Sequence, residues 1–245
     1  MKKPNINLLA VIVAVPVIGM TIIAPALTII KNDLNISFEN TQLILTLYFI
    51  FLAFGQVLSG PFSDKYGRKP ILLLGASIYS ISAFFASLSS NIEILLILRC
   101  FQGFGAAACL SVGRTILSDC YEIKEAAKEM SKMTAIMAVI PISCFIFGGF
   151  LAQFLGWRTN LIALGIISLI LIISMSFFLN ETLTKKAQSI SFKNMFIVYK
   201  GLINTLSFNF FTITTAMQTS MFFAMNGFMP YEFERKGVTM SEFGI

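Results

Sequence analysis

The residues of this sequence that could form ion pairs or transfer protons are the few charged ones that lie among apolar residues. The densest group lies in the stretch 60–69, GPFSDKYGRK, where one acid and three bases fall within six residues. The acid, Asp64, can face the positively charged N-terminal end of another helix. Arg68 can pair with Asp119, which follows much later in the chain. We therefore predict that this stretch ties helix ends together through ion pairs.

Two glycines accompany these charges. Gly60 precedes Asp64 by four residues and, having no side chain, lets a neighbouring helix approach closely. Gly67 supplies a tight turn between the charged residues. A generic basic loop at a membrane surface is the alternative interpretation. It explains the cations, but neither the glycines nor the acid.

Arg99 is a second candidate, because it lies within an otherwise apolar segment. An ionisable side chain in hydrocarbon costs several kcal/mol unless it faces a cavity or a partner. A functional role is therefore expected, and a purely structural hydrogen bond between helices is the alternative. Gly103 and Gly105 follow it and are assigned to close helix packing. They do not indicate a dinucleotide site, since no strand is predicted before them.

Other chemistry has few candidates in this sequence. There is no histidine, which excludes imidazole catalysis and histidine-ligated metal sites. The four cysteines have no zinc-type spacing and are interpreted as small buried apolar residues. None of the twelve acidic residues lies deep within an apolar segment, so general acid–base catalysis has almost no candidates. We predict no catalytic residue, no metal site and no cofactor.

Composition places the chain in a membrane. It is 56% hydrophobic and 12% charged, with a mean hydropathy of +0.82, whereas soluble domains carry about 25% charged residues. Seven apolar segments are each long enough to cross about 30 Å of hydrocarbon, where only a helix or a closed barrel satisfies its backbone. None alternates with a period of two, so we predict helices. The segments are Leu8–Ile30, Leu43–Phe62, Ile71–Ser89, Ile94–Leu117, Met133–Leu155, Leu161–Leu179 and Leu202–Tyr231.

The first segment has a rival interpretation. Lys2 and Lys3, an apolar stretch and the run Ala24-Pro-Ala26 are also typical of a cleaved signal peptide. The apolar run is long for that role and six more segments follow it. We therefore expect a first transmembrane helix.

Lysine and arginine set the orientation of a membrane protein. With the N-terminus in the cytoplasm, twelve of them fall inside and four outside, and Arg99 and Arg114 remain within the fourth segment. This asymmetry accounts for the net charge of +6 without a nucleic-acid partner. The inner residues are Lys2, Lys3, Lys65, Arg68, Lys69, Lys124, Lys128, Lys132, Lys185, Lys186, Lys193 and Lys200, and the outer ones are Lys31, Arg158, Arg235 and Lys236.

The connectors predict a division of the chain. Residues 1–180 are expected to form a six-helix bundle, and 181–201, rich in lysine and serine, a cytoplasmic linker. Residues 202–245 would hold the first helix of a second bundle that is otherwise absent, so the chain is expected to be truncated.

The stretch 60–69 resembles the signature between helices two and three of the major facilitator superfamily. The wider run from Leu45 to Pro70 is similar to the bicyclomycin/chloramphenicol-resistance branch of its drug:proton antiporters. The resemblance extends over essentially the whole chain. It implies an all-α membrane protein of two six-helix bundles, of which this chain holds seven spans. It also implies a conformational latch formed by Gly60, Asp64, Gly67, Arg68, Lys69 and Asp119.

Further motifs carry the same resemblance. Arg99, Gly103 and Gly105 lie in a run similar to the fourth-helix motif, in which the arginine is implicated in proton coupling. Pro141, Gly148 and Gly149 resemble the antiporter motif of the fifth helix. The sequence departs from the pattern in two places: Cys144-Phe145 replaces a small residue and proline, and Thr21 stands where the branch often has an aspartate.

These observations predict a secondary transporter that works by alternating access, with multidrug-type efflux coupled to protons. Its partners would be a small drug-like or metabolite substrate, protons and the lipid bilayer of a bacterial inner membrane, and no nucleic acid. The alternatives are a metabolite transporter of the same fold, a non-functional remnant, or a membrane-anchored interaction protein. Candidates for a broad apolar substrate cavity are Tyr48, Phe49, Gln102, Met137, Met217, Gln218, Phe222 and Asn226.

Overall fold

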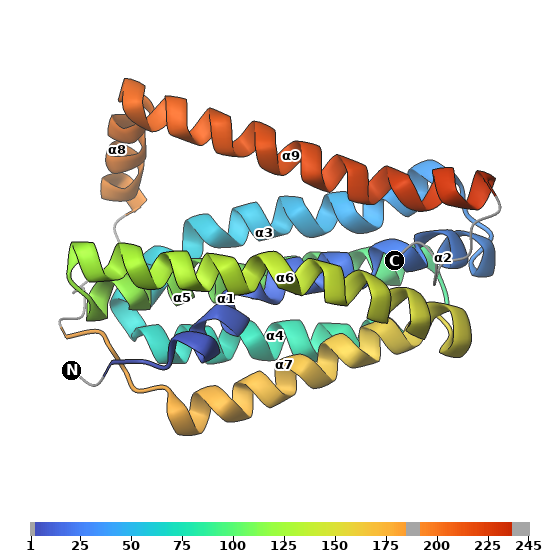
Figure 1. Ribbon diagram of the computed structural model, residues 1–245, viewed down its shortest axis with the longest axis horizontal. Helices are drawn as coiled ribbons and strands as arrows, with labels where there is room; N and C mark the ends of the chain where they lie inside the picture. The colour runs from blue at the N-terminus through green and yellow to red at the C-terminus, as the bar shows by residue number, and fades with distance from the viewer. Residues whose placement is uncertain (1–2, 185–191, 237–245) are drawn as a thin grey trace.

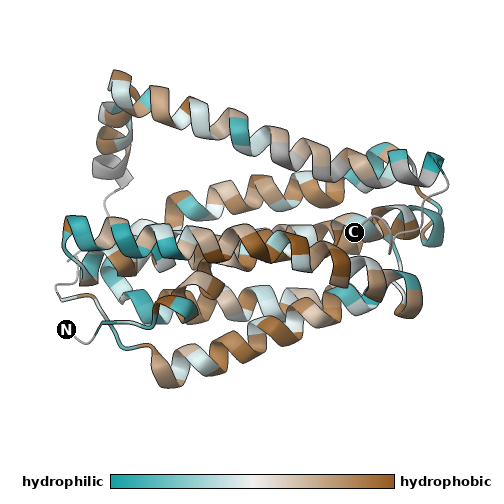
Figure 2. Cartoon of the chain, viewed as in Figure 1, coloured by the Kyte–Doolittle hydropathy of each residue, from teal (hydrophilic) through white to brown (hydrophobic). Residues whose placement is uncertain are grey.

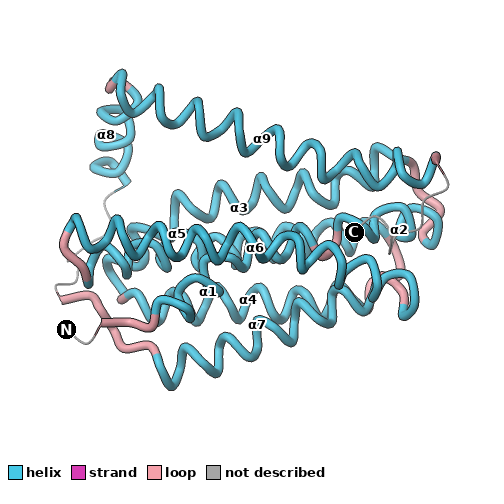
Figure 3. The backbone as a smooth tube through the Cα atoms, viewed as in Figure 1, coloured by secondary structure: helices cyan, strands magenta, loops and turns pink. Residues whose placement is uncertain are grey.

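A computed structural model describes residues 3–184 and 192–236, and all regular structure in those residues is helical (Figure 3). The helices run largely side by side along the long axis of the molecule (Figure 1). Their bounds are α1 Ile6–Thr21, η1 Ala24–Ala26, α2 Leu27–Asp33, α3 Phe38–Tyr66, α4 Arg68–Ser87, α5 Ile92–Cys120, α6 Ile123–Leu155, α7 Arg158–Phe178, α8 Phe192–Ile203 and α9 Leu206–Arg235.

Six helical units in the described residues are long and apolar enough to cross a membrane, the first being α1, η1 and α2 together. A seventh qualifies only as α8 joined to α9, which are bent by 86° at their junction. Apolar residues occupy the middle of the long helices, and hydrophilic ones gather at their ends (Figure 2). The predicted all-α membrane fold is confirmed. The predicted seventh segment, however, begins in the last turn of α8 and crosses this bend.

The first span is interrupted, which the hydropathy pattern did not predict. α1 ends at Thr21, and a short 3₁₀ turn with Pro25 near its start precedes α2. Proline has no backbone N–H, so Pro25 removes one hydrogen bond from the helical ladder at this point. The interruption leaves carbonyl groups of the first span available to side chains from other helices.

α5 occupies the centre of the bundle. It packs against α3 and α4 through small residues, which bring the backbones close together. An added Cβ on Gly55 of α3 would lie 2.7 Å from Ala107 Cβ, and one on Gly75 of α4 would lie 2.5 Å from Ala108 Cβ. α5 thereby fixes the position of both its own polar residues and the turn between α3 and α4.

Candidate functional site

The stretch 60–69 forms a tight turn between two helices. Gly67 alone separates α3 from α4 and has a φ of +115°. Residues that carry a side chain rarely adopt this left-handed backbone conformation, so glycine is required here. An added Cβ would also lie 2.6 Å from Glu181 Oε2. The predicted tight turn at Gly67 is therefore present.

The guanidinium group of Arg68 joins three helices at this turn. It pairs with Asp64 at the end of α3, and its Nη1 donates to Ser63 Oγ at 2.6 Å. Its Nε lies 2.9 Å from Asp119 Oδ2 at the end of α5. Arg68 is only 6% exposed, and the three acceptors compensate for its burial. The turn is thus connected to α5 by a charged network.

Glu181 belongs to this network, although the sequence analysis assigned it no role. Its Oε1 accepts from the backbone N–H of Arg68 at 3.0 Å, and its Oε2 accepts from that of Lys69 at 3.1 Å. The first N–H groups of a helix have no partner within the helix, so Glu181 caps α4 from a distant part of the chain. Lys69 also reaches toward α7, where its Nζ donates to Ser176 O at 2.8 Å.

The pKa of Glu181 reflects this arrangement. Partial burial opposes ionisation, but the N–H groups of Leu183, Arg68, Lys69 and Thr182 donate to the carboxylate and outweigh burial. The pKa is therefore lowered from its ordinary value.

One expectation for the turn was wrong within the described residues. Gly60 was predicted to admit a neighbouring helix, but an added Cβ there would meet nothing within 4 Å. Gly60 lies on a face of α3 that no described helix covers.

Arg99 lies in the core of the bundle with no exposed surface. Its guanidinium group donates to Gln102 Oε1 at 2.8 Å and to two carbonyl oxygens, Gly19 O at 3.2 Å and Ile44 O at 3.4 Å. It also lies 4.2 Å from the centroid of the Tyr48 ring. Among the described residues, no carboxylate pairs with Arg99. Neutral dipoles and an aromatic face therefore balance its charge.

Two tyrosines surround this arginine. The Tyr48 hydroxyl donates to Pro16 O at 3.0 Å. The Tyr79 hydroxyl and the Nε2 of Gln102 are buried and have no hydrogen-bond partner among the residues that the structure describes. Gly19 lies against both hydroxyl groups, since an added Cβ would be 2.4 Å from Tyr79 Oη and 2.8 Å from Tyr48 Oη. Arg99 thus lies among polar groups from α1, α3, α4 and α5.

The two glycines after Arg99 contact neighbouring backbones. An added Cβ on Gly103 would lie 2.2 Å from Tyr48 O, and one on Gly105 would lie 2.5 Å from Gly75 O. Any side chain at either position would therefore displace α3 or α4. The geometry agrees with the helix-packing role expected for Gly103 and Gly105.

The predicted motif of the fifth span lies on α6. Pro141 is inside the helix and buried, as are Gly148 and Gly149. An added Cβ on Gly148 would lie 2.4 Å from Ile22 O, at the break of the first span. Asn160 of α7 also reaches this break, where its Nδ2 donates to Ile22 O at 2.7 Å and to Gly148 O at 3.1 Å. Asn160 was not singled out from the sequence.

The suggested cavity-lining residues do not form one surface. Tyr48 and Gln102 are fully buried around Arg99, whereas Met217 and Gln218 are exposed on α9. The side chains of Phe222 and Asn226 lie outside the described residues. No substrate site follows from this set.

Comparison with known proteins decides the family. The sequence profile of the Major Facilitator Superfamily matches residues 9–245. The chain belongs to the major facilitator superfamily. Members of this superfamily are transporters, and the chain is a multi-pass integral membrane protein of that family.

Several curated relatives are named for drug resistance. A bicyclomycin resistance protein homolog of Haemophilus influenzae is 28% identical over 82% of this chain and 53% of its own length. A chloramphenicol resistance protein of Pseudomonas aeruginosa is 28% identical over 93% of this chain and 54% of its own length. Multidrug resistance protein D of Escherichia coli is 27% identical over 85% of this chain and 53% of its own length. The chain spans about half the length of these relatives.

Solved structures agree on the fold. A bacterial homolog of the human lysosomal transporter Spinster, inward-facing and unoccupied, superposes with a TM-score of 0.79 at 19% identity, covering 98% of this chain and 57% of that one. A D-xylose-proton symporter gives a TM-score of 0.70 at 14% identity, covering 98% of this chain and 64% of that one. The similarity establishes the major facilitator fold of the chain.

Proposed function

We propose that the chain is part of a secondary active transporter that exports small amphiphilic compounds in exchange for protons. The N-terminus and the turn at Gly67 lie on the cytoplasmic side of a bacterial inner membrane. Transport proceeds by alternating access, in which two bundles rock around a site near the middle of the membrane. The names of the drug-resistance relatives support the class of cargo, and the asymmetry of lysine and arginine supports the orientation.

The observation that carries this proposal is the environment of Arg99. Its guanidinium group has no exposed surface and pairs with no carboxylate in the described part of the chain, so its charge can attract an anion or repel a proton. Protonation of an acid on a facing bundle would change its electrostatic interaction with Arg99 and so favour one conformation. Proton coupling then depends on the charge of Arg99 rather than on a carboxylate in the described spans.

The network at Gly67 serves as the latch of this proposal. Arg68 holds Asp64 and Asp119 together on one side of the molecule, while Asp64 keeps a side chain that is 52% exposed. An exposed acid beside a buried cation can also accept from the N-terminus of a facing helix. The latch therefore stabilises one of the two conformations and binds no substrate.

Proton-dependent efflux from membrane vesicles tests this function. The chain would be compared with its Arg99→Ala and Asp64→Asn variants, using a fluorescent amphiphilic dye and an imposed pH gradient. We expect Arg99→Ala to abolish gradient-driven efflux and Asp64→Asn to slow it. Efflux that is unchanged in both variants would refute the mechanism. If the parent itself shows no efflux, a role without transport is supported instead.

A further inference from the structure

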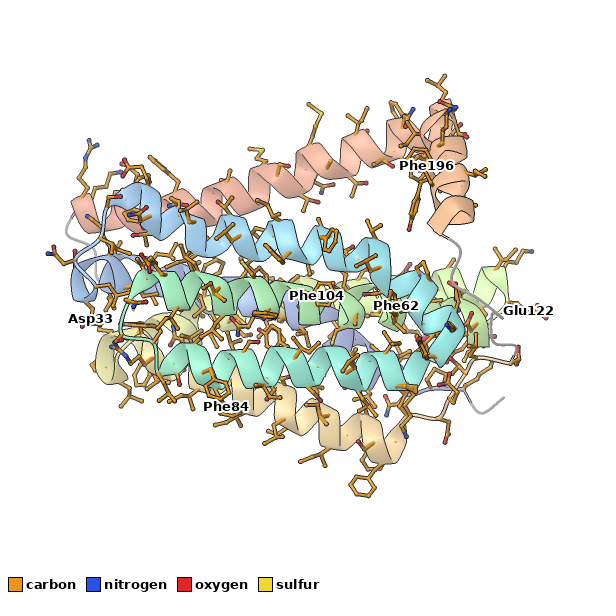
Figure 4. The ribbon with its side chains drawn as sticks, turned by 180° about the vertical axis from the view of Figure 1, so that it is seen from behind. Asp33, Phe62, Phe84, Phe104, Glu122 and Phe196 are labelled. Carbon is orange, nitrogen blue, oxygen red and sulfur yellow. The ribbon has the colours of Figure 1, made fainter. Side chains whose placement is uncertain are left out.

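A groove opens on the face of the bundle formed by α3, α4 and α5. The cavity has a volume of about 150 Å³ and is lined mainly by apolar side chains, among them Leu58, Phe62, Leu74 and Phe104. Phe62 and Phe104 lie on the same face of the molecule, which is seen from behind in Figure 4. All three helices are membrane spans, so this groove lies within the depth of the bilayer.

The lining restricts what the groove can hold. Ser59 is the polar side chain in the lining, and its hydroxyl donates to Gly55 O of its own helix at 2.6 Å. No hydrogen-bond donor of the lining is left for a polar ligand. An apolar cavity of this volume accommodates a group the size of benzene. A section of a lipid acyl chain therefore fits the groove in both chemistry and size.

A cation lies beside one end of this groove. The rings of Phe62 and Tyr66 are stacked with centroids 6.1 Å apart, and Lys65 Nζ lies 5.2 Å from the centroid of the Tyr66 ring. Tyr66 is the last residue of α3, where the span meets the membrane interface. Lys65 makes no ion pair in the part of the chain that the structure describes. Its charge is thus available to a lipid phosphate at that interface.

We propose that this groove is a binding site for an anionic phospholipid. One acyl chain lies against Leu58, Leu74 and Phe104, and the phosphate pairs with Lys65 beside Tyr66. The site goes beyond the proposed transport function and does not depend on it, since it needs only the fold of α3, α4 and α5. A bound lipid would join α3 and α4.

Fluorescence quenching in lipid vesicles tests the site. Phe104→Trp places a fluorophore in the groove, and the parent chain, with only Trp157 at the start of α7, supplies the background. The protein would be reconstituted in phosphatidylcholine containing increasing fractions of dibrominated phosphatidylglycerol or dibrominated phosphatidylcholine. A lysine near the surface contributes about 1 kcal/mol to binding an anionic lipid, so we expect half-maximal quenching at about a five-fold lower fraction of phosphatidylglycerol.

Two variants and one control, all in the Phe104→Trp background, distinguish binding of the headgroup from binding of the acyl chain. Lys65→Gln should remove the preference for phosphatidylglycerol, whereas Lys128→Gln, an exposed lysine near the start of α6, should keep it. Leu74→Phe should fill the groove and weaken quenching by both lipids. Equal quenching by both lipids before these changes, or a preference that survives Lys65→Gln, would overturn the proposal. Quenching unaffected by Leu74→Phe would show that the surrounding bilayer, and not a groove-bound chain, is being detected.

Discussion

Replacing Glu181 by glutamine tests whether a distant carboxylate holds the start of α4. The carboxylate accepts from the first two backbone N–H groups of that helix, one on each oxygen. Glutamine keeps one accepting oxygen and loses the negative charge. A hydrogen bond to a charged group contributes about 1.5–3 kcal/mol and a neutral one about 0.5–1.5 kcal/mol. Since the side chain is only partly buried and is therefore screened by solvent, we expect a loss of about 1–2 kcal/mol.

The measurement is thermal unfolding of the purified protein in detergent. For a chain of this length, the expected loss lowers the midpoint of unfolding by about 2–8 °C at neutral pH. Glu122→Gln is the matched control, because Glu122 occupies the N-cap of α6 but makes no capping hydrogen bond through its side chain. That variant should unfold within about 1 °C of the parent.

The difference in stability between the parent and Glu181→Gln should decrease as the pH falls. The pKa of Glu181 is lower in the folded protein than in the unfolded chain, so its contribution is present above the unfolded value of about 4.3. The contribution is lost as pH falls through the folded pKa. The difference between parent and Glu181→Gln should therefore be constant from pH 7 to pH 5 and shrink below that. A difference that persists undiminished at pH 3 would refute the capping argument.

Two further predictions concern close packing and the break in the first span. Gly103→Ala should destabilise the chain by about 1–3 kcal/mol, since the new methyl group would clash with Tyr48 O. Gly60→Ala adds a methyl group where no described atom lies within 4 Å, so it should be nearly neutral in the same thermal assay. Equal midpoints for the two variants would contradict the packing. Asn160→Ala removes the donor to two buried carbonyl groups and should lower the stability of the first span by about 2–4 kcal/mol. The measurement is hydrogen exchange of the first-span amides, which should become faster. Unchanged exchange would show that the asparagine does not hold the break.

The sequence predicted the first six spans and the burial of Arg99 because both depend on local composition. An arginine flanked by apolar residues must enter the bundle core or a cavity, whichever helices surround it. The turn at Gly67 was also predictable, since the glycine and its charged neighbours are adjacent in the chain. The pairing of Arg68 with Asp119 required only that the ends of α3 and α5 meet.

Other parts of the site depend on contacts that no local pattern encodes. Glu181 and Arg68 are 113 residues apart, and the cap forms only because α7 returns to the end of the bundle where α4 begins. Asn160 resembles any polar residue near a helix start until the break at Ile22 is known. No described residue approaches Gly60 for a related reason: small size permits a close contact, but the arrangement of helices decides whether a neighbour is present.

The interrupted first span has a mechanical consequence. A continuous helix behaves as one stiff rod, whereas α1 and α2 are two short rods joined at residues 22–26. The two rods are fastened to different helices, because Arg99 of α5 holds Gly19 of α1, whereas Asp33 at the end of α2 pairs with Arg158 at the start of α7. A tilt of α2 is therefore carried to α7 more directly than to α5. The charged core around Arg99 can stay in place while the opposite end of the same span changes its angle.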